Sequence, residues 1–268
     1  MIEKYNLNNK LVLIKADQIL QQIRCVEAVI EAGGNPILIG SNMNNLVEGS
    51  EKIDKKYSTS TFISLIDATN EQDIIKLKQT ILSKFDTYPD ILINDSVIEF
   101  EHHDLDEGSN MKLDERMIKT WDRIIRKELT TILLLTKIFG NQMAKTNGGV
   151  ILNILSDMYL NPKLNISDSL LNVNDISSIT VANGLIGLTK YIATYWNKKN
   201  VRSNALTIGA YNEHSYTTKD RVDLINQIPI ERLADNDEFK AAIIFLVSDA
   251  SSYMTGSNLV INGGRTCW

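Results

Sequence analysis

The stretch "LVLIKADQILQQIRCVEAVIEAGG", residues 11–34, reads as a strand, a turn and a helix. Residues 11–14 form a short apolar run without alternation, which is typical of a strand covered on both faces. The turn at residues 15–22 contains no glycine. A dinucleotide-binding turn usually needs glycine, because its backbone bends tightly and approaches the pyrophosphate closely. The stretch therefore predicts a nucleotide-binding type of fold whose first turn lacks the usual chemistry.

Further apolar runs of strand length recur along the chain, and helical patterns such as residues 121–143 and 185–196 separate them. The runs are residues 36–39, 61–66, 91–93, 150–154, 203–207 and 259–261. This alternation predicts an α/β fold with a doubly wound parallel sheet of about seven strands flanked by helices. No repeat or low-complexity linker divides the chain, so we expect one domain over residues 1–268. Ligands of such sheets bind beyond the carboxyl ends of the strands.

The composition excludes several classes of protein. The formal net charge of −5 argues against nucleic acid as a partner, because phosphate backbones are bound by clustered Lys and Arg. The apolar runs are too short to span a bilayer, and the first residues lack the apolar stretch of a signal peptide. Two cysteines, Cys25 and Cys267, do not indicate a disulfide framework. We therefore expect a cytoplasmic protein without a membrane partner.

Several motifs, in order, resemble the short-chain dehydrogenase/reductase family. They are "LINDSV" (92–97), "GGVILNILSD" (148–157), "NGLIGLTKYIATYWNKKNVRSNALTIG" (183–209) and "IPIERLADNDEFKAAIIFLVSDASSYMTGSNLVINGG" (228–264). The resemblance covers essentially the whole chain and implies a Rossmann-like fold. The ending "GGRTCW" resembles the ends of family members from the branch found with bacterial surface-sugar and flagellin-modification pathways.

The resemblance implies a catalytic set that this chain mostly lacks. The family's catalytic serine corresponds to Ser156. Counted without a gap, its tyrosine corresponds to Ser178, its lysine to Ala182 and its asparagine to Glu128. A serine hydroxyl is a much weaker acid than a phenol, and alanine offers neither charge nor donor. We therefore expect the ordinary hydride-transfer mechanism to be lost.

The resemblance leads to a similar expectation for the cofactor. The glycines of the family's first turn correspond to Ala16, Leu20 and Gln22, and no acidic residue follows the second strand to bind an NAD ribose. Asp67 resembles the family's adenine-contacting aspartate, and Asn94 keeps the first residue of its N-N-A-G motif. The sequence thus predicts that no nicotinamide cofactor binds, and that the first turn only joins a strand to a helix.

Some candidates keep two interpretations. Ser156 is either an inherited hydroxyl at a strand end, which we favour, or a functional group. Glu128 is either a surface residue or a new acid/base beside Ser156, since a carboxylate on an apolar helix must be paired, protonated or hydrated. His102 and His103 are adjacent in an acidic stretch, which favours a solvated loop, and we expect no metal site.

Two functional hypotheses follow. The favoured one is a catalytically degenerate member of the fold, acting as a binding or partner protein in a homo-oligomer, or in a hetero-oligomer with an active paralogue. Its basis is that the long helices through which family members associate look intact. The alternative is an oxidoreductase dependent on NAD or NADP, with a remodelled site that acts on a sugar-type alcohol or carbonyl.

Overall fold

Seven parallel strands form one sheet in the order β3-β2-β1-β4-β5-β6-β7. The computed structural model describes residues 2–17, 19–96, 115–160, 174–212 and 217–267. The strands are β1 (Leu11–Lys15), β2 (Asn35–Gly40), β3 (Phe62–Leu65), β4 (Ile91–Ser96), β5 (Gly149–Ser156), β6 (Val201–Ile208) and β7 (Asn258–Ile261). Each coincides with one of the apolar runs, so the predicted doubly wound sheet is confirmed.

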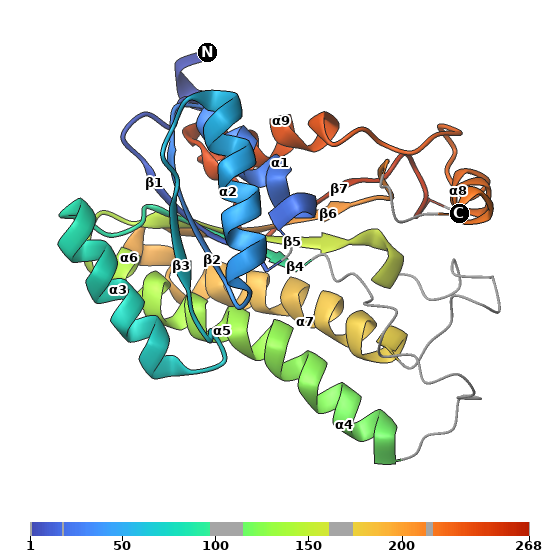
Figure 1. Cartoon of the computed structure of the whole chain (residues 1–268), viewed down its shortest axis with the longest axis horizontal. Helices are drawn as coiled ribbons and strands as arrows, with labels where there is room; N and C mark the ends of the chain where they lie inside the picture. The colour runs from blue at the N-terminus through green and yellow to red at the C-terminus, as the bar shows by residue number, and fades with distance from the viewer. Residues whose placement is uncertain (1, 18, 97–114, 161–173, 213–216, 268) are drawn as a thin grey trace.

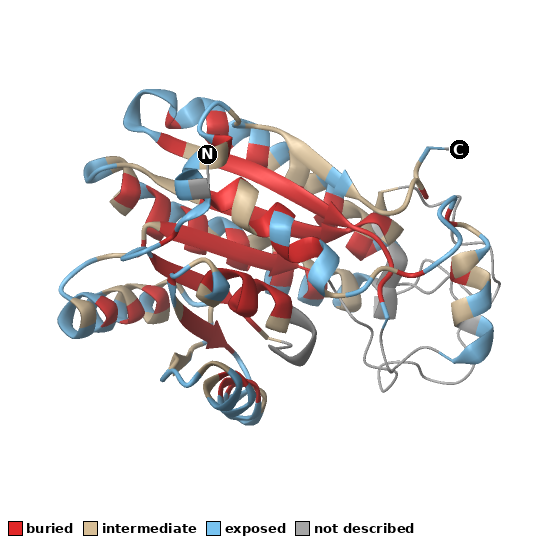
Figure 2. Ribbon diagram, turned by 90° about the horizontal axis from the view of Figure 1, so that it is seen from above, coloured by how far each residue is buried: buried red, intermediate tan, exposed pale blue. Residues whose placement is uncertain are grey.

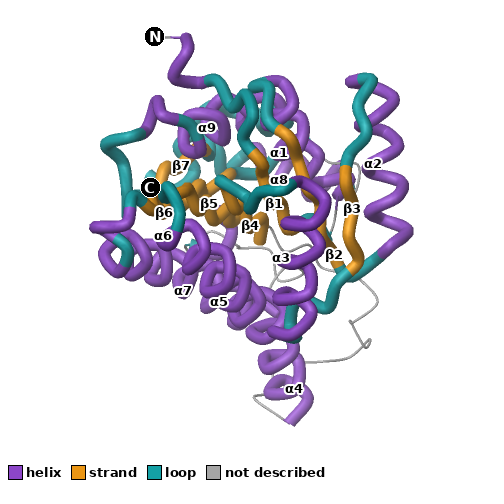
Figure 3. The backbone as a smooth tube through the Cα atoms, turned by 90° about the vertical axis from the view of Figure 1, so that its left-hand side faces the viewer, coloured by secondary structure: helices purple, strands orange, loops and turns teal. Residues whose placement is uncertain are grey.

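Helices cover both faces of this sheet (Figures 1 and 3). One face carries α1 (Ile19–Glu31), α2 (Met43–Tyr57) and α9 (Asp237–Val247). The other carries α3 (Glu71–Phe85), α4 (Glu115–Ile124), α5 (Thr131–Leu135), α6 (Asn141–Lys145) and α7 (Asn174–Tyr195). Helix α8 (Thr218–Ile225) follows β6 and lies apart from both layers in Figure 1. Across the part of the chain that the structure describes, no helix combines the length and apolarity needed to cross a membrane.

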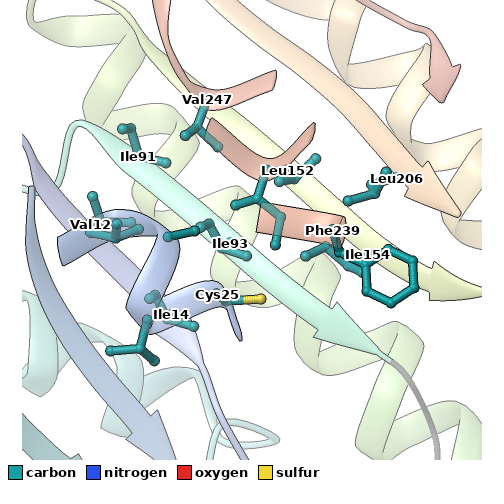
Figure 4. Packing of buried hydrophobic residues seen from close by; sticks show 14 of the residues in the cluster. Val12, Ile14, Cys25, Ile91, Ile93, Leu152, Ile154, Leu206, Phe239 and Val247 are labelled. Carbon is teal, nitrogen blue, oxygen red and sulfur yellow. The ribbon is translucent and has the colours of Figure 1, made fainter. Parts of the chain in front are cut away.

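The strands are apolar on both sides, and alternate residues serve the two layers. Val12 and Ile14 of β1 pack under α1 and α9, whereas Leu11 and Leu13 face α3 and the middle helices. Figure 2 shows the central strands as a buried band, whereas the edge strands β3 and β7 are partly exposed. Figure 4 shows the packing on the α1 and α9 side. This two-sided burial explains why the strand sequences do not alternate between apolar and polar residues.

The long middle helix differs from the continuous helix predicted over residues 121–143. Two π-helical segments interrupt it, at Ile125–Thr130 and Thr136–Gly140. A π-helical segment widens the helix and shifts the faces that its residues present, and such segments are frequent at functional sites. Glu128 lies in the first segment and is buried, so it is not the surface residue that one interpretation allowed.

The second π-helical segment generates a prediction about packing. A β-carbon at Gly140 would meet the ring of Trp196, whereas at Gly187 no described atom lies within 4 Å. Gly140→Ala should therefore lower the free energy of unfolding by about 1–3 kcal/mol through overpacking. Gly187→Ala is the matched control and should raise it by about 0.5–1 kcal/mol, because alanine favours a helix interior. Urea denaturation measures both, and equal effects at the two sites would contradict this packing.

Candidate functional site

Polar side chains gather where β1, β4 and β5 end. Lys15 is the last residue of β1 and pairs in register with Asn94 of β4, and Ser96 ends β4 opposite Leu155 of β5. Ser156 follows directly and ends β5. Neighbouring strands lie about 4.8 Å apart, so these residues line one stretch of the carboxyl edge. This edge is the ligand-binding side of a doubly wound sheet.

A buried ion cluster occupies the centre of this edge. The Lys15 Nζ lies 2.8 Å from Asp17 Oδ2 and 3.1 Å from Glu128 Oε2, and only 3% of its side chain is exposed. Ser96 Oγ donates to the same Glu128 oxygen at 3.2 Å. Burial alone would lower the pKa of Lys15, but the charges of Glu128 and Asp17 outweigh it and raise that pKa. Lys15 is therefore a fixed cation at neutral pH rather than a proton donor.

Asp17 ties the first turn to the end of β2. Its Oδ1 accepts hydrogen bonds from the backbone N–H of Ser41 at 2.9 Å and from Ser41 Oγ at 3.0 Å. Asn45 Nδ2 donates to the Asp17 carbonyl at 3.3 Å. Burial would raise the pKa of Asp17, but the charge of Lys15 and these hydrogen bonds lower it below its ordinary value. Asp17 is thus a permanent carboxylate between β1 and β2.

A second network of side-chain hydrogen bonds links β4, β5 and α7. Asn94 Nδ2 donates to Asn153 Oδ1 at 2.9 Å, and Asn153 Nδ2 donates to Thr189 Oγ1 at 2.9 Å. Thr189 Oγ1 in turn donates to the Leu185 carbonyl at 2.7 Å. The Oδ1 atom of Asn94 is buried and has no partner among the described residues. This network holds the three elements together, and it leaves the Oδ1 atom of Asn94 as an acceptor without a partner among the described residues.

Two further buried ion pairs flank the edge. Arg24 of α1 lies 3.0 Å from Asp95 of β4, and its guanidinium stacks over the ring of Tyr211 at 5.1 Å. Arg265 lies 3.0 Å from Asp157, the residue that follows Ser156. The side chains of both pairs are fully buried. These pairs anchor α1 and the C-terminal segment to the strand ends, and pattern reading along the sequence did not find them.

The predicted catalytic candidates lie at this edge but have different contacts. Ser156 Oγ accepts from the Met158 N–H at 3.3 Å, and Ser156 is buried. Glu128 contacts Lys15 and Ser96, and among the described residues it makes no hydrogen bond with Ser156. Ser178 and Ala182 are buried on α7, where Ala182 belongs to an apolar cluster. The ungapped tyrosine and lysine positions therefore hold no titratable pair.

The two predicted cofactor-binding residues, Asp67 and Asn94, lie in different environments. Asp67 is exposed after β3, and its Oδ1 accepts from the N–H and Oγ1 of Thr69. Asn94 is buried and belongs to the hydrogen-bond network that links β4, β5 and α7. The side chains of Leu20 and Gln22, and the whole segment with His102 and His103, lie outside the described residues. Within the described ranges, no group of three or more His, Cys, Asp or Glu residues is placed to hold a metal ion.

Comparison with known proteins identifies the family of the chain. A family model described as enoyl-(acyl carrier protein) reductase matches residues 23–266. The chain belongs to the short-chain dehydrogenase/reductase family. It is 28% identical over 243 residues to 3-oxoacyl-(acyl-carrier-protein) reductase of Aquifex aeolicus, covering 89% of this chain and 90% of that protein.

Other relatives of this chain are named for sugar-type substrates. Glucose 1-dehydrogenase 2 of Bacillus subtilis is 29% identical over 208 residues, which cover 75% of this chain and 73% of that one. The fold also matches a gluconate 5-dehydrogenase of Burkholderia cenocepacia in complex with NADP and tartrate. That match has a TM-score of 0.79 and 18% identity, and it covers 100% of this chain and 99% of that one.

The expectation of a catalytically degenerate partner protein is therefore wrong. The relatives are named as dehydrogenases and reductases, and the family model runs through Ser156, α7 and the C-terminal segment. The expectation that no nicotinamide cofactor binds is likewise not supported. The error came from testing motif positions one by one, because a fold can keep its chemistry with other residues. Glu128 was among the predicted candidates, but its pairing with Lys15 and the contact of Lys15 with Asp17 were not predicted.

The described residues fit the adenosine half of a dinucleotide. Ser41 and Asp67 are exposed after β2 and β3, which are neighbours in the sheet, and Asp17 brings a carboxylate to the same place. Helix α1 begins at Ile19, so its first N–H groups face the first turn, as anion-binding helices require. The unpartnered Asn94 Oδ1 offers a further acceptor in the middle of the edge.

The ion cluster generates a prediction with a defined pH dependence. Lys15→Met removes the cation from two partly buried carboxylates and should lower the free energy of unfolding by about 3–5 kcal/mol at about pH 7. In the wild type the lowered pKa of Asp17 gives stability that is present above about pH 4 and is lost below it. In the variant Asp17 loses the charge of Lys15, so burial raises its pKa and it takes up a proton as the pH falls. The difference between the two proteins should therefore narrow from about pH 7 to about pH 4.

The control for this prediction is Lys52→Met, because Lys52 pairs with Glu48 on the exposed surface of α2 at 2.9 Å. That change should cost about 0.5 kcal/mol or less. Urea denaturation at the two pH values measures both variants. A loss in Lys15→Met that is no larger than in Lys52→Met, or that does not change with pH, would contradict the described pairing.

Proposed function

We propose that this protein is an NAD(P)-dependent oxidoreductase with a remodelled site that acts on a sugar-type alcohol or carbonyl. The observation that carries the proposal is the family match over residues 23–266, which includes the whole carboxyl edge from β4 onward. The polar cluster at that edge gives the proposal its residues. A bound nicotinamide would supply the hydride acceptor or donor.

Glu128 and Ser156 take the main roles in this proposal. The Ser156 hydroxyl orients the substrate oxygen from the end of β5. In the oxidative direction, the Glu128 carboxylate takes the proton of the substrate hydroxyl, and in reduction it returns that proton to the new alkoxide. Lys15 and Ser96 hold Glu128 by two hydrogen bonds at 3.1 and 3.2 Å. Lys15 stays charged and does not itself transfer a proton.

The substrate class rests on the names of the relatives and on the polarity of the edge. Glucose 1-dehydrogenase 2 and gluconate 5-dehydrogenase are named for polyhydroxylated substrates. The hydroxyls of Ser96 and Ser156 and the free acceptor of Asn94 match a ligand with several hydroxyl groups. A purely apolar substrate would leave these groups without partners, which costs free energy.

Calorimetric titration of NAD, NADH, NADP and NADPH into the purified protein tests the proposal first. We expect at least one of the four to bind at micromolar strength. A panel of polyols and aldoses, with the bound cofactor monitored by absorbance, then identifies the substrate. Glu128→Gln should retain cofactor binding and lower turnover about a hundred- to ten-thousandfold, because a positioned acid/base contributes a factor of this size.

Ser203→Ala is the control for Glu128→Gln. The Ser203 hydroxyl is buried, as Glu128 is, but it lies near the amino end of β6. It has no hydrogen-bond partner among the described residues. It should leave turnover unchanged. No heat with any of the four dinucleotides would remove the proposed function, and full turnover in Glu128→Gln would remove the role of that residue.

We also propose that the chain associates through the α4 and α7 side of the molecule, with a second copy or with a paralogue of the same fold. Large apolar side chains are exposed there: Ile118, Leu133, Ile176, Tyr191 and Tyr195. The rings of Tyr191 and Tyr195 stack with their centroids 5.6 Å apart, although both are about 60% exposed. Exposed apolar groups that cluster on one side are typical of an interface.

The double variant Tyr191→Glu and Tyr195→Glu should dissociate this oligomer, because the interface would bury unpaired carboxylates. Native mass measurement of wild type and variant at equal concentration checks this. Tyr253→Glu is the control, since Tyr253 is a fully exposed aromatic side chain outside α4 and α7. It should leave the mass unchanged. A wild-type protein that is only a monomer would contradict the proposed association.

A further inference from the structure

The end of β2 lacks the acidic residue that usually selects the adenosine ribose. In doubly wound dinucleotide-binding folds, a carboxylate after the second strand accepts the ribose 2′-hydroxyl of NAD, and a cation there accepts the 2′-phosphate of NADP. Here β2 ends at Gly40, and Ser41 to Asn45 contain neither an acid nor a base. The sequence alone therefore gives no reason for this chain to prefer either cofactor.

The structure supplies a carboxylate at this place from another segment. Asp17 lies in the turn after β1, and its Oδ1 is within 3.0 Å of both the N–H and the hydroxyl of Ser41. Its carboxylate thus stands beside the backbone position from which a conventional ribose-binding acid would project. About 15% of the Asp17 side chain is exposed, so the side chain is partly accessible to a ligand.

Nearby cations do not offset this charge for a ligand. Lys15 is the cation next to Asp17, but it is 3% exposed and is held between Asp17 and Glu128. The three groups together carry a formal charge of −1. A 2′-phosphate would add negative charge beside a carboxylate that is ionised at neutral pH. A 2′-hydroxyl would instead donate a hydrogen bond to it.

We propose that Asp17, supplied by the first turn and held in place by Ser41, is the residue that selects NAD(H) against NADP(H) in this protein. The inference rests on the proposed function, because it requires that a dinucleotide binds. It assigns a carboxylate from the first turn the role that usually belongs to an acid after the second strand. It also gives the glycine-free turn a function in recognition.

Binding of NADH and NADPH, measured by calorimetry and by the fluorescence of the reduced nicotinamide, tests the inference without requiring turnover. We expect the wild type to bind NADH about tenfold to a hundredfold more tightly than NADPH, as expected for one added like-charge contact near a protein surface. In Asp17→Ser this ratio should fall to about one or invert, because Lys15 then has only Glu128 as a partner. Asp17→Asn keeps the shape of the side chain and should lower the ratio through loss of charge alone.

Two further variants serve as controls. Asp67→Asn removes a carboxylate at the end of the neighbouring strand, and it should change the affinity for both cofactors equally because both contain the same adenine. Ser41→Ala removes one of the two hydrogen bonds that hold Asp17 and should lower the ratio less than Asp17→Asn does. Each cofactor is titrated into a separate portion of the same preparation. Partial unfolding of a variant then changes both apparent affinities alike, and the ratio of NADH to NADPH affinity stays informative.

The outcomes separate this inference from the function on which it rests. If neither cofactor binds the wild type, the proposed function fails and the inference fails with it. If both bind but the wild type shows no preference, or prefers NADPH, the oxidoreductase proposal stands and the role of Asp17 is overturned. An NADH preference that survives unchanged in Asp17→Ser and Asp17→Asn also overturns it. A preference lost in both variants and kept in Asp67→Asn supports it.

Discussion

A buried carboxylate must have a cation beside it, and this constraint organises the carboxyl edge of the sheet. Burying an isolated charge costs many kcal/mol, so such groups persist only when they are paired and hydrogen-bonded. Three carboxylates are buried at this edge within the described residues, Asp95, Glu128 and Asp157. Each has a buried cation within 3.1 Å, from Arg24, Lys15 and Arg265 respectively.

These pairs connect the sheet to elements that its apolar core does not position by itself. Arg24 fixes the orientation of α1, and Glu128 turns inward because a π-helical segment carries it. Arg265 brings the C-terminal segment next to the strand that ends in Ser156. The apolar strands thus determine the layers, whereas the charged pairs determine where the polar groups of the site lie. Fold and site depend on different kinds of interaction.

The difference explains what the sequence could predict. Apolar runs are local signals, so all seven strands and their parallel arrangement followed from residues close together in the chain. The π-helical segments were missed because a helical pattern of apolar residues does not show an extra residue in a turn. The pairing of Lys15 with Glu128 was missed because it joins residues 113 positions apart. No local pattern encodes such a contact.

The functional hypothesis failed for a related reason. Ser178 and Ala182 replace the family's tyrosine and lysine in an ungapped comparison, and the comparison treated their loss as a loss of activity. Neither Lys15 nor Asp17 was predicted as a site residue from the sequence. Their meaning depends on Ser41 and Glu128, which come from other elements. Contacts between residues so far apart in the sequence are visible only when the chain is folded.

The same separations affect how the chain folds. The three charged pairs span 71, 113 and 108 residues, so each requires the closure of a long loop. Contacts of this kind form late, because loop closure costs entropy before the contact returns any free energy. Until the strands are assembled, the charged groups of the edge stay hydrated and apart. We expect the charged pairs to close only once the strands that carry them have paired, so mutations in the polar edge should alter the unfolding rate more than the folding rate.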